Sequence, residues 1–244
     1  MRFIGLDLTD PYAKQPRRVD VALVDERGRC EFAALPGHDV RRALARMPAG
    51  SRKGDILIID GPLALASPGC RLRECERILA TAGKTPDVLP VPGSRPYAGF
   101  VRGSVELATE LADDGWAPAA DEVAPATMLE AYPGCSWRAL AGRRLPRKTT
   151  AEGFRARSLL LLRKGLRFLE APQTHDQLDA GLCAWLGWTL RHAPERIRLV
   201  GPRAFELAGH LREGSILQVG AADRKTFANS SGNVLDGEQS GSRP

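Results

Sequence analysis

An apolar, strand-like run near the start of the chain carries a carboxylate in its middle. The run spans residues 3–10, reads Phe-Ile-Gly-Leu-Asp-Leu-Thr-Asp, and has Asp7 where a buried strand would carry an apolar side chain. Burying an ionised carboxylate without a partner costs several kcal/mol or more. The chain must therefore adopt a fold that pairs this acid, binds a metal ion to it or keeps it protonated.

Two further core-like elements also carry acids. The strand-like segment 55–62 has Asp60 directly before a Gly-Pro pair, and an apolar helix later in the chain opens with Asp176 and Asp179. Two positions three residues apart on a helix share one face, so both carboxylates can reach the same point. Three acidic elements that lie far apart in sequence are the arrangement that a divalent-metal site requires.

Strand and helix patterns alternate after an opening meander of three strands. Strands are expected at residues 3–8, 19–24, 30–35, 55–60, 127–132, 197–200 and 215–219, and helices at 38–47, 71–82, 100–113, 136–141, 151–164 and 176–191. This order predicts a layered α/β fold with a mixed central β-sheet flanked by helices. If Asp7 and Asp60 end neighbouring central strands, their carboxylates lie side by side at one edge of the sheet.

The length of 244 residues suits one large domain, and no internal repeat or strong linker divides the chain. We predict a single domain over residues 1–221 and a disordered tail over 222–244, where Ser, Gly and Asn are frequent. The apolar runs are too short to span a bilayer. The first residues do not resemble a secretory signal. We expect a cytoplasmic protein without membrane association, and its oligomeric state is left open.

The five cysteines follow no metal-binding or disulfide pattern. They include no C-x-x-C pair, no histidine lies at zinc-finger spacing, and the odd number argues against a disulfide framework. We expect all of them to be reduced residues with a packing role: Cys30, Cys70, Cys75, Cys135 and Cys183.

Acids gathered at one point repel one another unless a cation binds them. Hard oxygen ligands suit Mg²⁺ or Mn²⁺, and two such ions can activate a water and stabilise the leaving oxygen of a phosphodiester. The candidate metal ligands, which are also the candidate catalytic groups, are the four aspartates of these elements: Asp7, Asp60, Asp176 and Asp179.

Three of these aspartates also have ordinary structural explanations. Asp7 could accept hydrogen bonds from backbone amides at the end of its strand. Asp60 could simply form a turn, and Asp176 could cap its helix. Asp179 is harder to explain in this way, because it lies within the first turn of an otherwise apolar helix.

Three more residues are candidates for the same region. Glu130 lies on a buried-looking strand and could join the site or pair with a basic residue such as Arg155 or Lys148. His175 could move protons beside the metal or stabilise the start of its helix. Lys148 follows a basic run and precedes a helix, so it could bind phosphate or belong to a plain basic loop.

Basic residues crowd the region between Arg138 and Arg167. The whole chain has 35 Lys and Arg against 29 Asp and Glu, a formal net charge of +6. The cluster could follow a phosphate backbone, or it could be the solvated face of helices. No motif distinguishes a DNA partner from an RNA partner. The candidate nucleic-acid-binding residues are Arg144, Arg147, Lys148 and Arg155.

Several motifs together resemble the family known as domain of unknown function 429. They follow the family's order from the first residue to the helix that ends near Arg191, and they lie at residues 3–7, 58–63, 70–77, 130–133, 140–145, 148–155 and 175–180. The resemblance implies a ribonuclease H-like fold and the activity of a predicted nuclease.

The layout of the acids is also similar to that of Holliday-junction resolvases, which share the implied fold. That similarity maps the four candidate aspartates onto the resolvases' metal ligands. Two features differ: Asp60 stands where a resolvase usually has the longer Glu, and Glu130 has no counterpart in that set.

These observations favour a metal-dependent nuclease that hydrolyses phosphodiester bonds through an acidic two-metal site. The alternative is a non-catalytic nucleic-acid-binding or adaptor protein on the same fold. A phosphotransferase of the actin and sugar-kinase type ranks lower, because that class needs a duplicated core and a second Gly-rich phosphate loop.

Overall fold

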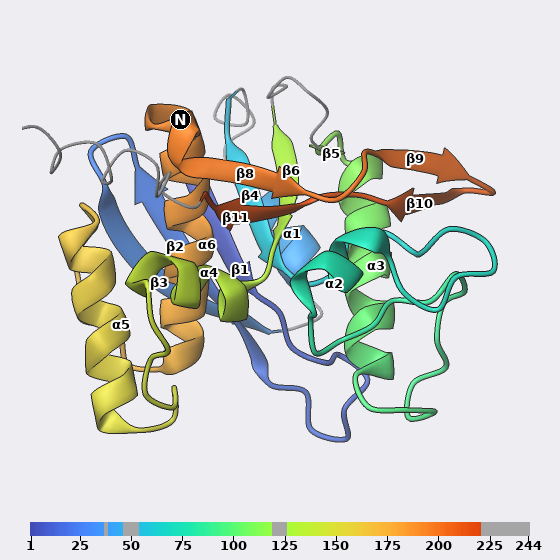
Figure 1. The fold of residues 1–244 in the computed structure, drawn as a ribbon, viewed down its shortest axis with the longest axis horizontal. Helices are drawn as coiled ribbons and strands as arrows, with labels where there is room; N and C mark the ends of the chain where they lie inside the picture. Colours follow the sequence, from blue (N-terminus) through green and yellow to red (C-terminus); the bar gives the residue numbers. More distant parts are fainter. Residues whose placement is uncertain (37–38, 46–53, 119–125, 221–244) are drawn as a thin grey trace, which may run out of the picture.

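The computed structural model describes residues 1–36, 39–45, 54–118 and 126–220. A mixed β-sheet lies at its centre with helices against both faces (Figure 1), which confirms the predicted α/β class. The strands are β1 (Arg2–Asp7), β2 (Arg18–Asp25), β3 (Arg29–Pro36), β4 (Ile56–Asp60), β5 (Ala117–Pro118), β6 (Thr127–Ala131), β7 (Arg167–Phe168), β8 (Ile197–Val200), β9 (Ala204–Leu207), β10 (His210–Glu213) and β11 (Ile216–Val219). The helices are α1 (Val40–Ala45), α2 (Glu74–Leu79), α3 (Ala98–Asp113), α4 (Pro133–Ala141), α5 (Ala151–Arg163) and α6 (His175–His192), followed by a 3₁₀ turn at Pro194–Arg196.

Strand β1 lies in the interior of the sheet, as the opening meander predicts. The strands run in the order β7-β3-β2-β1-β4-β6-β11-β8, and β5 pairs with β6. β1 is antiparallel to β2 and parallel to β4, while β4 and β6 are parallel to each other. This topology is consistent with a ribonuclease H-like fold.

Alternate residues of β1 face two different cores, because successive side chains of a strand point to opposite faces. Phe3 packs in the core that contains α6, whereas Ile4 and Leu6 pack in the core that contains α1 and α3. Helix α6 is apolar around most of its circumference and is accordingly buried along most of its length.

Gly5 allows α6 to lie directly on β1. A Cβ atom at this position would lie 2.0 Å from the carbonyl oxygen of Ala180 and 2.5 Å from the backbone nitrogen of Ala184. Only a residue without a side chain leaves room for so close a contact. Because Asp7 follows Gly5 by two residues and Asp179 precedes Ala180, the same contact brings these two acids together.

Helix α2 is shorter than the helix predicted at residues 71–82. Arg73 lies directly before the helix, and both the backbone N–H and the guanidinium of Arg73 donate hydrogen bonds to Glu76. The buried face carries Cys75 and Glu76, while Ile78, expected on the apolar side, is 53% exposed. The buried face of α2 therefore carries the acid Glu76, whereas the helical period predicts an apolar face that includes Ile78.

The hairpin formed by β9 and β10 was not predicted. Its first strand is mostly exposed, with Phe205 and Leu207 open to solvent, so it lacks the alternation of buried and polar residues that indicates a strand. The predicted tail at 222–244 and both ends of the helix predicted at 38–47 lie outside the described residues. Among the helices that the structure describes, none is long and apolar enough to cross a membrane.

All five cysteines are free thiols. Cys30, Cys75 and Cys183 are buried and have the expected packing role. Cys70 is exposed and Cys135 is half-buried, so the expectation of a packing role was wrong for Cys70.

Candidate metal centre

The register of the sheet places Asp7 and Asp60 side by side. They end β1 and β4, which are parallel neighbours, and their Cα atoms are paired across the two strands. Their side chains lie on the face covered by α6, where the charge of Asp60 acts on Asp7. The predicted meeting of these two acids at a sheet edge is therefore confirmed.

Helix α6 adds two more carboxylates. Oxygen atoms of Asp7, Asp176 and Asp179 all lie within 4.8 Å of one another, so these three residues could hold a metal ion. Asp176 does not cap the helix, since Thr174 Oγ1 is the cap and accepts the backbone N–H of Gln177 at 3.0 Å. Asp60 is not part of this three-residue group and lies beside it, next to Asp7.

Two of the carboxyls hold their protons unusually strongly. Burial, followed by the charges of Asp60, Asp179 and Asp176, raises the pKa of Asp7 to about 10. Burial and the charge of Asp179 raise the pKa of Asp60 to about 8. Such values are expected where several acids share one poorly solvated point without enough positive charge. A bound cation would supply that charge.

Asp179 is held from two sides. Trp137, on α4, donates its indole N–H to Asp179 Oδ1 at 2.5 Å, and the Lys148 ammonium donates to Oδ2 at 3.0 Å. The Arg157 guanidinium lies over the Trp137 ring, 5.7 Å from its centre. With both oxygens engaged and 4% of the residue exposed, the Asp179 carboxylate has one fixed orientation.

Asp176 is the more accessible acid on α6. Its Oδ1 lies 2.6 Å from His175 Nδ1 and 3.5 Å from the Lys148 ammonium, and its Oδ2 lies 3.5 Å from an Arg17 guanidinium nitrogen. Burial opposes ionisation, but His175 and Lys148 outweigh it and lower the pKa of Asp176. His175 is therefore positioned beside the acids, as predicted for a proton carrier or a structural partner.

Asp20 is an acid of this region that the sequence analysis missed. It lies on β2 directly opposite Asp7, and it is half-buried. Burial and the nearby charge of Asp176 raise its pKa. Asp20 reaches this position because β1 and β2 pair in an antiparallel register that sets it opposite Asp7. That register is the signal that indicates Asp20 as part of the site. Trp137 and Arg17 were also missed, because neither belongs to an acidic motif.

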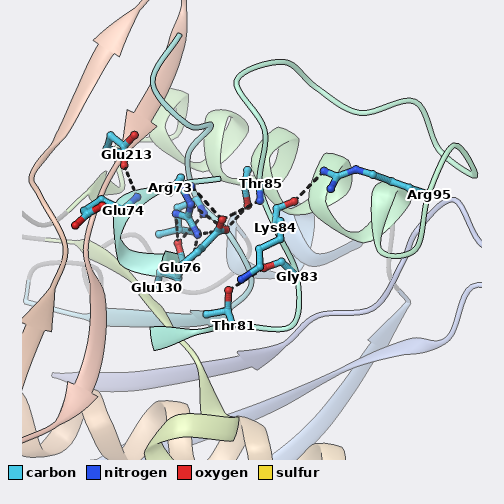
Figure 2. Close-up of polar contacts among 11 residues, drawn as sticks. Arg73, Glu74, Glu76, Thr81, Gly83, Lys84, Thr85, Arg95, Glu130 and Glu213 are labelled. Carbon is cyan, nitrogen blue, oxygen red and sulfur yellow. Dashed lines mark hydrogen bonds and ion pairs between the residues drawn. The ribbon is translucent and has the colours of Figure 1, made fainter. Parts of the chain in front are cut away.

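Glu130 lies on the opposite face of the sheet. Its neighbour Ala131 is paired with Asp60, so the alternation of β6 directs the Glu130 side chain away from the acids. There it accepts two guanidinium N–H groups of Arg73, each at 2.6 Å (Figure 2). It also accepts the backbone N–H of Leu63 at 3.1 Å. Of the two alternatives, an ion pair is the one observed. The prediction that Arg155 or Lys148 would be the partner of Glu130 was wrong, because the partner is Arg73.

Asp176 borders a cavity with basic walls. It has a volume of about 730 Å³ and lies at the start of α5 and α6. Arg17, Lys148 and Arg155 line it together with Asp176, so two of the predicted phosphate-binding residues meet there. Arg144 and Arg147 are exposed in the segment between α4 and α5 and do not line this cavity.

One comparison with known proteins gives a match. The sequence model of the family described as "Protein of unknown function (DUF429)" matches residues 5–204. This span contains the four candidate aspartates, the last part of β1 and every element from β2 to β8. No curated protein and no solved structure gives a significant match to the chain.

Proposed function

Because the chain belongs to the DUF429 family of proteins of unknown function, whose description names no activity, we propose its function from the acidic site: a metal-dependent nuclease that hydrolyses phosphodiester bonds. The observation that carries this proposal is the close grouping of Asp7, at the end of β1, with Asp176 and Asp179, at the start of α6. Asp60 stands beside that group with a raised pKa. The proposed place of action is the cytoplasm.

The donor set favours a hard cation. The group offers only carboxylate oxygens, which are the ligands of Mg²⁺ and Mn²⁺ rather than of softer metals. Asp7, Asp176 and Asp179 would hold one ion, and Asp60 together with Asp7 would contribute to a second. When bound, such ions activate a water and neutralise charge on the reacting phosphate.

The surrounding side chains provide the remaining functions. Lys148, Arg155 and Arg17 line one cavity beside the acids and would hold the phosphates of a nucleic acid strand. His175, in contact with Asp176, would carry a proton to or from the solvent. Trp137 would keep Asp179 in its orientation.

One observation favours a second candidate function. The Lys148 ammonium already lies within 3.0 Å of Asp179 and 3.5 Å of Asp176, where it partly neutralises the acids without a metal. The chain would then be a non-catalytic nucleic-acid-binding or adaptor protein, with the basic cavity as its binding surface.

Calorimetric titration with Mn²⁺ separates the two functions. We expect the native protein to bind Mn²⁺, and Asp7→Asn and Asp179→Asn to lose that binding. Asp113→Asn, an exposed acid at the end of α3, is the matched control and should bind like the native protein. Single-stranded and duplex DNA and RNA are then incubated with Mn²⁺. Cleavage by the native protein but not by Asp7→Asn supports the nuclease, whereas nucleic-acid binding without Mn²⁺ binding supports the adaptor.

A further inference from the structure

A second cavity borders the acids on the side of Asp60. Its volume is about 220 Å³, below the range of about 300–1,000 Å³ typical of pockets for drug-sized ligands, so it suits one ring system. Asp60 lines this cavity, whereas Asp176 lines the basic cavity described above. Two of the four aspartates therefore line different cavities, Asp60 the small one and Asp176 the larger, basic one.

Three aromatic residues line the small cavity: Tyr97, Phe100 and Tyr132. They come from the start of α3 and from the segment after β6, and Tyr97 is 56% exposed, so it forms part of the rim. The backbone of Tyr97 is left-handed, with φ of 64°. A bulky residue adopts this conformation at a cost. Tyr97, the residue with this conformation, presents an exposed aromatic ring at the rim of the cavity.

The inner end of the cavity is rigid and rich in acceptor oxygens. Glu76 and Glu130 share the guanidinium of Arg73, and Glu76 also accepts the backbone N–H of Thr85 at 2.9 Å (Figure 2). All four residues line the cavity and are buried. Two carboxylates against one guanidinium, with Asp60 nearby, make this end unsuitable for an anion. A neutral ring with N–H groups fits it.

We propose that this cavity holds one unstacked nucleobase of the strand whose phosphate lies at the acids. The inference rests on the proposed nuclease function and specifies its substrate. Aromatic side chains stack on exposed bases in proteins that bind single strands, and the basic cavity beyond Asp176 would take the neighbouring phosphates. A fully paired duplex must first unpair and unstack a base before it can fill the cavity, which weakens its binding there. The substrate class is therefore single-stranded nucleic acid, or a strand with an unpaired base.

The test measures binding separately from cleavage. A short single-stranded oligonucleotide that carries one 2-aminopurine, in DNA and RNA versions, is titrated with the full-length protein in Ca²⁺. Anisotropy of an end label reports binding, and the 2-aminopurine fluorescence reports stacking. We expect strong quenching with the native protein. For Tyr97→Ala we expect loss of quenching and at least about fivefold weaker binding, the usual effect of removing one stacking residue.

Matched variants and substrates decide the outcome. Phe205→Ala removes an aromatic of similar exposure on β9, outside the cavity, and should bind and quench like the native protein. Binding with unchanged fluorescence, equal affinity for Tyr97→Ala, or equal affinity for a fully paired duplex would overturn the base pocket and leave the nuclease proposal intact. If neither single-stranded oligonucleotide binds, the base pocket is overturned, and if the duplex does not bind either, the nuclease proposal is overturned as well.

Discussion

Asp7 and Asp60 occupy paired positions at the ends of two parallel strands, and the charge of Asp60 makes Asp7 harder to ionise. The sheet register leaves neither residue free to turn away, because both side chains point to the face that α6 covers. The fold thus holds a group of acids together at a cost to the metal-free protein. That cost is what a bound cation would remove, and it can be measured as a dependence of stability on pH.

The first prediction concerns the stability of the metal-free protein. The pKa of Asp7 is about 10 in the folded state against an ordinary value of 3.8, so the folded protein binds more protons than the unfolded chain between these limits. Its stability should therefore fall as pH rises, and we expect the melting temperature in a chelator to drop from about pH 5 to about pH 9. Added Mn²⁺ should reverse the drop.

Asp7→Asn removes the titrating carboxyl from this group. The variant should have a flatter pH profile and a higher melting temperature than the native protein at alkaline pH, by about 2–4 °C for each kcal/mol of relieved repulsion. Asp113→Asn should keep the native profile. A native melting temperature that is constant or rises over this pH range would show that the acids are not forced together.

Gly5→Ala should disrupt both the fold and the site. The new Cβ would meet backbone atoms of Ala180 and Ala184, which cannot rotate away, so α6 has to shift on the sheet. We expect a loss of about 1–3 kcal/mol or more, measured by urea denaturation, and weaker Mn²⁺ binding by the folded fraction. Gly83→Ala, where no atom lies within 4 Å of the added Cβ, is the control. Equal stability of the two variants would contradict the close contact.

Trp137→Phe tests the orientation of Asp179. The change keeps an aromatic ring in the core but removes the indole N–H that Asp179 Oδ1 accepts. Loss of a partner that orients a metal ligand commonly weakens metal affinity about 10- to 100-fold, and calorimetry with Mn²⁺ measures it. Trp188→Phe removes an indole donor whose acceptor is the Glu26 carbonyl, far from the acids, and should bind Mn²⁺ normally. A similar affinity of both variants would leave Trp137 with a packing role only.

Arg73→Met should lower the free energy of unfolding far more than Arg77→Met does. Arg73 is buried between two acids, and removing one partner of a buried ion pair costs about 3–5 kcal/mol. Arg77 forms an exposed pair with Glu74 at the same helix, so its loss should have no measurable effect. Urea denaturation compares the two variants. A small effect at Arg73 would contradict its role as the counter-charge of Glu76 and Glu130.

Much of the site followed from two sequence patterns. The apolar runs around Asp7 and Asp60 indicated buried strands, and the spacing of Asp176 and Asp179 indicated one helix face. Neighbouring parallel strands then brought the first two together, because each strand ends on its acid. The four aspartates proposed as Mg²⁺ or Mn²⁺ ligands could be predicted from the sequence because each belongs to one of these local patterns.

The remaining features depend on strand register and on contacts between distant segments. Asp20 reaches the site only because β2 pairs with β1 in one particular register. The Glu130 side chain points away from the site because it lies one residue before Ala131, which is the residue of β6 that pairs with Asp60. Its partner Arg73 lies in a segment predicted as an ordinary amphipathic helix. No local pattern distinguishes a buried arginine from an exposed one, so the network around α2 could not have been predicted.

Lys148→Gln should have opposite effects on the two ligands of the site. The ammonium lies close to Asp176 and Asp179, so removing it relieves repulsion with a metal ion, by about 1 kcal/mol for charges about 4 Å apart in water, or about fivefold in Mn²⁺ affinity. The same change removes one basic group from the wall of the basic cavity. Nucleic-acid affinity should fall, and the slope of its logarithm against the logarithm of salt concentration should decrease by about 0.7 for a single strand. Lys164→Gln, a half-buried lysine at the far end of α5, should change neither quantity. If Lys148→Gln instead weakened Mn²⁺ binding while leaving the salt slope unchanged, the lysine would support the acids structurally and would not contact phosphate.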